Sequence, residues 1–310
     1  MNNIFRVPCA VFFLFLILSS TGCVGKVPNS LSESQMQAIS HNQRGIKYAA
    51  RGDNLQAVVE FSEALKISRS IENSEGIVVA LVNSSRVHRH AGDAKAALAA
   101  ISGAIPFTHP LALLYAEVAF EMAQVKLLSG DLNEASEWAS KAVAADNSST
   151  RGMMINLLAR IQFLKGNIAE AELKAQEALL INRNNGVRAE EANSLRTLGD
   201  IKAIAADRSV EAAAYYNQAL VIDKVLGKSG KIVADLRALA RLAQSQNDSG
   251  RALEFYSRAF SASRADGDLS GASEDLMNMS LIHEKRGEME LSRRLLTERD
   301  TILKNIRTPQ

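Results

Sequence analysis

Small and apolar residues recur at helical spacing after short polar turns along most of this chain. After Gly52-Asp53, the residues Ala57, Phe61 and Ala64 stand four and three positions apart, which places them on one face of a helix. The same arrangement returns six more times, with these residues: Ala97, Ile101 and Ala104; Ala135, Ala139 and Ala142; Ala171, Ala175 and Ala178; Ala212, Tyr216 and Ala219; Ala252, Tyr256 and Ala259; and, more weakly, Ser292 and Leu296. Self-similarity of this kind predicts a stack of helical hairpins.

The first residue of each set recurs every 36 to 41 positions, and the pattern resembles the tetratricopeptide repeat (TPR). The second helix of that repeat carries Ala, an aromatic residue and Ala at these offsets. Its first helix carries residues matched here by Gly45 and Tyr48 and by Leu198-Gly199. The resemblance implies an all-α, right-handed superhelical solenoid of about seven TPR-like hairpins over residues 32–306, with a C-terminal tail at 307–310. It also implies a scaffold that binds partner proteins or peptides on its concave surface.

Composition fits that architecture. The 310 residues include only five prolines and 5% aromatic residues, and abundant alanine allows helices to approach closely. The formal net charge of +2 gives no reason to expect nucleic acid as a partner. The charged last segment, 289–306, predicts a helix that caps the array with a polar outer face. At the other end, a capping box would start the first helix at Ser32 with Gln35, or at Ser30 with Glu33.

The N-terminus has the pattern of an export signal. An apolar run over residues 7–18 follows Arg6 and is too short to span a bilayer. The segment Ser20-Thr21-Gly22-Cys23 resembles a bacterial lipobox, which implies a signal peptide over residues 1–22, a lipidated Cys23 that takes palmitate, and a tether over residues 23–31. Because Val24 rather than Asp follows the cysteine, the resemblance favours an outer-membrane lipoprotein facing the periplasm. The inner membrane, secretion, an uncleaved anchor or an incidental cysteine are the alternatives.

No group of residues in the sequence predicts catalysis, a cofactor site or a metal site. The five histidines are scattered, no paired cysteines occur, and no His-Glu-x-x-His sequence is present. Gly227-Lys228-Ser229 looks like the end of a phosphate-binding loop but lacks the earlier glycine, so we interpret it as a turn between repeats. We therefore predict a protein that is not an enzyme.

A stripe of arginines stands out on the predicted first helices. The resemblance places four positions of each first helix in the concave groove, and these include Arg86, Arg89, Asn156, Arg160, Asn193, Arg196, Arg237 and Arg241. Guanidinium groups bind carboxylates in a bidentate manner, so the stripe predicts a groove for acidic or C-terminal peptide segments. Glu117, Glu121 and Asp200 map to the same surface, which leaves local ion pairs as an equal alternative.

Three functions remain open on the sequence. The first is a non-catalytic scaffold, lipid-anchored in the bacterial envelope, that acts as an adaptor for envelope, pilus or secretion assembly. The second is a soluble cytoplasmic regulator that senses peptides, and the third and most remote is an enzyme on a helical scaffold.

Overall fold

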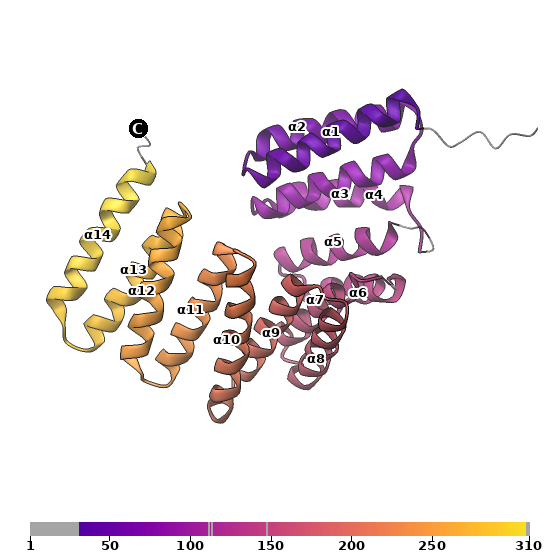
Figure 1. Ribbon diagram of the computed structural model, residues 1–310. Helices are drawn as coiled ribbons and strands as arrows, with labels where there is room; N and C mark the ends of the chain where they lie inside the picture. The colour runs from indigo at the N-terminus through magenta and orange to yellow at the C-terminus, as the bar shows by residue number, and fades with distance from the viewer. Residues whose placement is uncertain (1–30, 111, 113, 147, 308–310) are drawn as a thin grey trace, which may run out of the picture.

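The computed structural model is an all-α, TPR-like solenoid of fourteen helices in seven antiparallel hairpins across the residues it describes, which are 31–110, 112, 114–146 and 148–307. The hairpins follow one another along a curved path from α1 to α14 (Figure 1). The predicted signal peptide, Cys23 and all of the tether but Leu31 lie outside the described residues, as does the tail beyond Arg307. No helix within the described ranges is long and apolar enough to cross a membrane.

The first helices of the hairpins line up along one side of the array. They are α1 (Glu33–Ala50), α3 (Ser74–His90), α5 (Tyr115–Leu128), α7 (Arg151–Leu164), α9 (Arg188–Lys202), α11 (Ser229–Ser245) and α13 (Leu269–Lys285). The second helices are α2 (Asn54–Ser70), α4 (Ala94–Ala104), α6 (Leu132–Ala145), α8 (Ile168–Asn184), α10 (Ser209–Val225), α12 (Ser249–Ala265) and α14 (Met289–Arg307). Two short 3-10 turns, Ile105–Phe107 and Ala206–Arg208, complete the described part of the chain.

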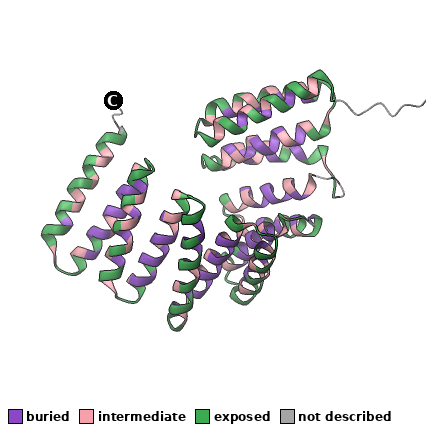
Figure 2. Cartoon of the chain, viewed as in Figure 1, coloured by how far each residue is buried: buried purple, intermediate pink, exposed green. Residues whose placement is uncertain are grey.

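The recurrent small residues occupy the contacts between helices, as the spacing predicts. Ala57, Ala97, Ala135, Ala171, Ala212 and Ala252 are all 0% exposed, and Ser292 at the seventh equivalent position is also buried. Buried side chains form several clusters between neighbouring helices, while exposed residues cover the turns and outer faces (Figure 2). Each hairpin therefore depends on its neighbours for burial, which is the physical basis of a solenoid.

Turn chemistry sets the ends of the helices. Gly52, Gly92, Gly130 and Gly166 all have φ near +80°, the left-handed conformation that favours glycine at the end of a helix. The aspartate that follows three of these glycines caps the next helix: the side chain of Asp53, for example, accepts the backbone N–H of Gln56. At the start of the array, Ser32 and Gln35 form the predicted capping box.

The fifth hairpin differs from the glycine-type turn. The predicted turn at Ala206-Asp207 is a 3-10 turn without a left-handed residue, and charged side chains surround it. The ammonium group of Lys202, whose side chain is only 2% exposed, pairs with Glu172 on α8. Arg208 binds the same carboxylate at 3.0 Å, and both cations also pair with Glu211, so Glu172 joins α8 to this turn.

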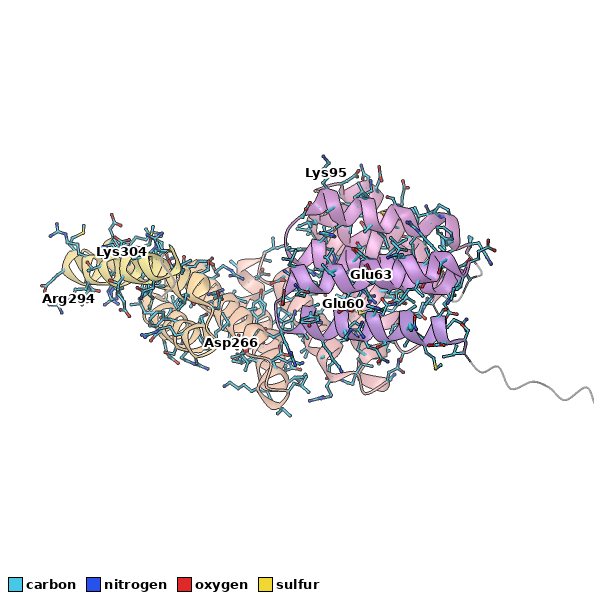
Figure 3. The ribbon with its side chains drawn as sticks, turned by 90° about the horizontal axis from the view of Figure 1, so that it is seen from above. Glu60, Glu63, Lys95, Asp266, Arg294 and Lys304 are labelled. Carbon is cyan, nitrogen blue, oxygen red and sulfur yellow. The ribbon has the colours of Figure 1, made fainter. Side chains whose placement is uncertain are left out.

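The last helix closes the array with a largely charged surface. Seen from above, α14 forms the free end of the solenoid and carries the exposed residues Arg294 and Lys304 (Figure 3). Its Leu295 and Ile302 pack on the cluster that contains Leu276 and Met279 of α13. One face of α14 therefore covers α13 while the opposite face meets solvent, as the sequence predicts for a terminal cap.

Candidate functional site

The first helices of hairpins two to six enclose a cavity of about 570 Å³. Six of the eight residues predicted for the groove line it: Arg86, Arg89, Asn156, Arg160, Asn193 and Arg196. Arg241 lines a second cavity of about 310 Å³, and Arg237 lines neither. Most of the residues that the TPR resemblance assigns to the groove therefore line a cavity, but they do not play one common role.

Two arginines of α3 are bound to carboxylates of the next hairpin. Arg89 holds Glu121 of α5 in a bidentate pair, with Nε at 2.9 Å from Oε1 and Nη2 at 3.1 Å from Oε2. Arg86 donates to Glu117 of α5 at 2.6 Å. Glu121 is fully buried and also accepts the hydroxyl of Ser85. A buried carboxylate with this set of donors joins α3 to α5, so these arginines belong mainly to the scaffold.

Arg196 and Arg237 make the same connection further along the array. Arg196 of α9 donates from Nε to Asp235 of α11 at 2.6 Å, and its Nη2 binds Asp223 of α10. Its Nη1 donates to Asn193, which is thereby occupied in holding the guanidinium in place. Burial and the nearby Asp223 raise the pKa of Asp235 to about 6, although Arg196 opposes that shift.

Arg237 lines neither cavity, because its guanidinium is turned into the next hairpin. Its Nε and Nη2 bind both carboxylate oxygens of Asp275 in α13, at 2.7 and 2.8 Å, and Nη2 also donates to the carbonyl of Gly271 at 2.7 Å. The side chain of Asp275 is fully buried, so the alternative of local ion pairs describes this arginine. A ligand in the cavity would not meet it.

Arg160 and Arg241 are the two arginines of the stripe that stay available. Both are exposed, and neither forms a hydrogen bond or ion pair within the described part of the chain. They lie on α7 and α11, on either side of Asp200 of α9, where their charges act to lower the pKa of Asp200. Burial outweighs them and raises that pKa overall, and Oδ1 of Asp200 accepts the hydroxyl of Tyr216 at 2.7 Å.

The cavity has two further polar features that bear on binding. Asn156 is 5% exposed, and its Oδ1 has no hydrogen-bond partner within the residues described, although a buried acceptor normally has one. Lys231 reaches the cavity from the first turn of α11, and burial together with the charge of Arg196 lowers its pKa. The pKa of His90 is lowered by desolvation and by Arg89. The lining also includes the carboxylates of Glu190 and Asp200, so Arg160 and Lys231 are the cations of this cavity left to attract an anion.

Sequence reasoning missed Lys231 and the apolar side chains of the second cavity, Phe163 and Ile204. Lys231 stands six residues before Arg237, nearly two helical turns, while Phe163 stands three residues after Arg160 and Ile204 lies in the turn that follows α9. Extending the groove assignment by one turn would have included Phe163 but not Lys231. Among the described residues, no cluster of three or more histidine, aspartate or glutamate side chains is placed to hold a metal ion.

The fold and the concave cavity define a TPR-like helical repeat protein, and comparison with solved structures agrees with that class. No family model matches the chain, and no curated protein matches it in sequence. The similarity to the solved structures lies in the fold, at sequence identities below 20%.

Three solved structures show the range of similar proteins. PilF of Pseudomonas aeruginosa is 18% identical, with a TM-score of 0.54 over 78% of this chain and 98% of that one. PilW, described as a widely conserved type IV pilus biogenesis factor, is 16% identical, with a TM-score of 0.55 over 71% and 91% of the two chains. A Rap protein in complex with competence and sporulation factor is 13% identical, with a TM-score of 0.62 over 89% and 77%.

Proposed function

We propose that this protein is a scaffold that binds an acidic segment of a partner protein or peptide in its concave groove. The observation that carries the proposal is the pair of exposed guanidinium groups, Arg160 and Arg241, which face the groove on either side of Asp200 and form no hydrogen bond or ion pair within the described residues. Lys231 adds a third cation to the lining. Arg86, Arg89 and Arg196 hold the helices in place around these groups.

A capture experiment with charge-reversed variants tests the proposal. Arg160→Glu combined with Arg241→Glu should lose partners that the wild-type protein retains from an extract of its native cells, because both groove cations become anions. The matched control is Arg69→Glu combined with Arg293→Glu, two exposed arginines on α2 and α14, away from both cavities. An identical set of partners for the two double variants would contradict the proposal, provided that both keep their helical circular dichroism.

We extend the proposal to where the scaffold acts: Cys23 carries a lipid, and the protein faces the periplasm as an envelope adaptor. The support is the lipobox-like segment Ser20-Thr21-Gly22-Cys23, together with the fold shared with PilF and PilW. Labelled palmitate should enter the wild-type protein and not Cys23→Ala, and the wild-type protein should fractionate with membranes. Equal labelling of both proteins would rule out this anchor.

A second candidate function is favoured by one comparison. The Rap protein, which is complexed with a peptide factor, shares the fold at a TM-score of 0.62, so a soluble peptide-sensing regulator fits the groove equally well. The palmitate experiment separates the two candidates, because the regulator carries no lipid and remains in the soluble fraction.

A further inference from the structure

The outer faces of α8 and α10 are apolar, whereas the flanking helices α6 and α12 carry polar or small residues there. The outermost positions of each second helix lie opposite its buried alanines. On α6 and α12 these positions hold Asn133, Glu137, Ser140 and Ala144, and Gly250, Glu254, Ser257 and Ser261. On α8 they hold Ala169, Leu173, Gln176 and Leu180, and on α10 they hold Val210, Ala214, Asn217, Val221 and Val225.

The stripes on α8 and α10 form one patch on the side of the molecule away from the concave groove. Val210 and Val225 are each 79% exposed, Leu173 is 62% exposed, and Leu180 and Val221 are each 61% exposed. The two helices adjoin, because Leu179 of α8 and Tyr215 of α10 pack on the same two buried clusters. An exposed apolar patch with polar surroundings is typical of a contact surface.

Charged groups beside the patch are already paired within the molecule. Glu177 pairs with Lys174 at 2.8 Å, and Glu172 and Glu211 both pair with Arg208, at 3.0 and 3.2 Å. Because these carboxylates have their cations, they add little attraction for a strongly charged partner. The patch therefore fits a partner whose own surface is equally apolar.

The order of residues in the patch is nearly the same in both directions along each helix. On α10, Val210 lies seven residues before Asn217 and Val225 lies eight residues after it. On α8, Leu173 lies three residues before Gln176 and Leu180 lies four residues after it. A surface with this symmetry complements a second copy of itself turned end to end, as a two-fold contact between identical patches requires.

The two amides lie at the centre of this symmetry. Asn217 donates from Nδ2 to the carbonyl of Ala213 at 2.8 Å, and Gln176 donates from Nε2 to Glu172 at 3.3 Å. An amide has two N–H groups and an accepting oxygen, so each retains a donor and an acceptor for the same amide of a second copy. Polar pairs at the centre of an apolar contact fix its register.

The dimensions of the patch correspond to a weak, reversible dimer. Each of the two helices has 17 residues and is therefore about 25 Å long, so two helices of about 10 Å diameter cover roughly 500 Å² per copy. Twice that area lies near the lower limit for a specific interface. Because the hairpins follow a curved path with the cavities on its inner side, two outer surfaces touch over only a few helices (Figure 1).

We infer that a second copy of this chain covers the patch, in a two-fold dimer where α8 packs antiparallel on α8 of the partner subunit and α10 on α10 of the partner subunit. Leu173 then meets Leu180 of the partner subunit, and Val210 meets Val225 of the partner subunit. The concave cavities lie on the far sides of this dimer and stay open. The inference therefore goes beyond the proposed function and does not depend on it.

Sedimentation velocity of the full-length protein tests the dimer, with the same mild detergent for every variant. The wild-type protein should pass from monomer to dimer as its concentration rises, with a dissociation constant of roughly micromolar size. Leu180→Glu should weaken the dimer roughly 10-fold or more, because each dimer would bury two unpaired carboxylates. The matched control is Ser261→Glu, at the equivalent outer position of α12, which should dimerise like the wild-type protein.

Cysteine crosslinking with a short bismaleimide tests the antiparallel arrangement. Asn217→Cys should crosslink to itself, because it lies beside the two-fold axis. Val210→Cys alone should not, since its two copies would lie about 22 Å apart, at about 1.5 Å per helical residue. A mixture of Val210→Cys and Val225→Cys should crosslink. The wild-type protein, which retains Cys9 and Cys23, gives the background.

The outcomes separate a second copy from other occupants. A protein that stays monomeric at every concentration, or equal dimerisation of Leu180→Glu and Ser261→Glu, refutes the dimer. Self-crosslinking of Val210→Cys without that of Asn217→Cys refutes the antiparallel arrangement. A monomer that binds phosphatidylcholine vesicles, and binds them less after Leu180→Glu, assigns the patch to a lipid surface instead. None of these results changes partner capture in the concave groove, so this inference can fail while the proposed function stands.

Discussion

Two glycines in the first helices leave room for aromatic rings of the second helices. Gly199 lies against the ring of Tyr216, and an added Cβ would stand 2.5 Å from Cε1 of that ring. Gly45 has the same relation to Phe61 in the first hairpin. The glycine and the aromatic residue are thus one packing unit, although the sequence shows them as separate features of the repeat.

Gly199→Ala should destabilise the protein by about 1–3 kcal/mol, because the new methyl group overlaps a buried ring that has little room to move. Gly230→Ala is the matched control: this glycine lies in α11, and an added Cβ meets no atom within 4 Å. The control should be neutral or slightly stabilising, since alanine favours a helix more than glycine does. Urea unfolding followed by circular dichroism measures both, and equal midpoints for the two variants would refute the packing argument.

Asp235 gives the protein an unusual dependence on pH. Its pKa is raised to about 6 in the folded protein, against an ordinary value near 3.9 when unfolded, because burial and Asp223 oppose its charge. The folded state therefore binds the proton more tightly, and the contribution of this group to stability falls as pH rises from about 4 to 6.

The comparison with Asp235→Asn isolates that contribution. The stability of the wild-type protein minus that of the variant should decrease over this pH window, by at most about 1.4 kcal/mol per pH unit for one proton. Urea unfolding of both proteins at pH 4.5, 5.5 and 7 measures the difference. A difference that grows with pH would mean that Arg196 outweighs burial and holds the pKa low.

Among the helices, the same ionic contact recurs in the second half of the array. An arginine of one first helix reaches a buried aspartate of the next, from Arg196 on α9 to Asp235 on α11 and from Arg237 on α11 to Asp275 on α13. The separations of 39 and 38 residues match the repeat length. These contacts connect successive hairpins. They also give each buried aspartate a cationic partner, which the alanine contacts between the helices cannot supply.

Arg237→Ala should destabilise the docking of α13 and α14 by about 3–5 kcal/mol, because it leaves the buried carboxylate of Asp275 without its cation. Arg251→Ala should change stability by less than about 1 kcal/mol, since its pair with Asp248 is exposed. Hydrogen exchange of backbone amides in residues 269–307 reads out the docking directly. Equal exchange in the two variants would contradict the structural role given to Arg237.

The sequence predicted where the helices and their buried residues lie, but it did not predict which arginines are paired with carboxylates. Periodicity alone located the hairpins and the buried series from Ala57 to Ser292, because burial on one helix face needs only spacing. The resemblance to the TPR, rather than periodicity, assigned the face that holds Arg160. It could not separate Arg160 from Arg237, because that difference depends on whether a carboxylate of the following hairpin reaches the guanidinium. The repeated Arg-to-Asp separation of 38–39 residues was the available signal.

At the scale of the whole molecule, stability depends on the terminal helix α14 as well as on the contacts between successive hairpins. Removal of residues 288–310 should expose the apolar face of α13, where Leu276 and Met279 contact the cluster reached by Leu295 and Ile302. The truncated protein should bind a hydrophobic dye and unfold at a lower temperature, because terminal repeats supply the polar outer surface of a solenoid. Unchanged dye binding and melting temperature would show that α14 is not a structural cap.

The arginine-to-aspartate contacts also have a consequence for engineering. A hairpin whose arginine pairs with a buried aspartate of the next hairpin cannot be deleted, duplicated or transplanted by itself. Separating the two hairpins would leave the buried aspartate without its cation. Artificial arrays assembled from this chain would need to keep α9 through α14 together, and α3 through α6 likewise, because Arg89 binds the buried Glu121 in the same way.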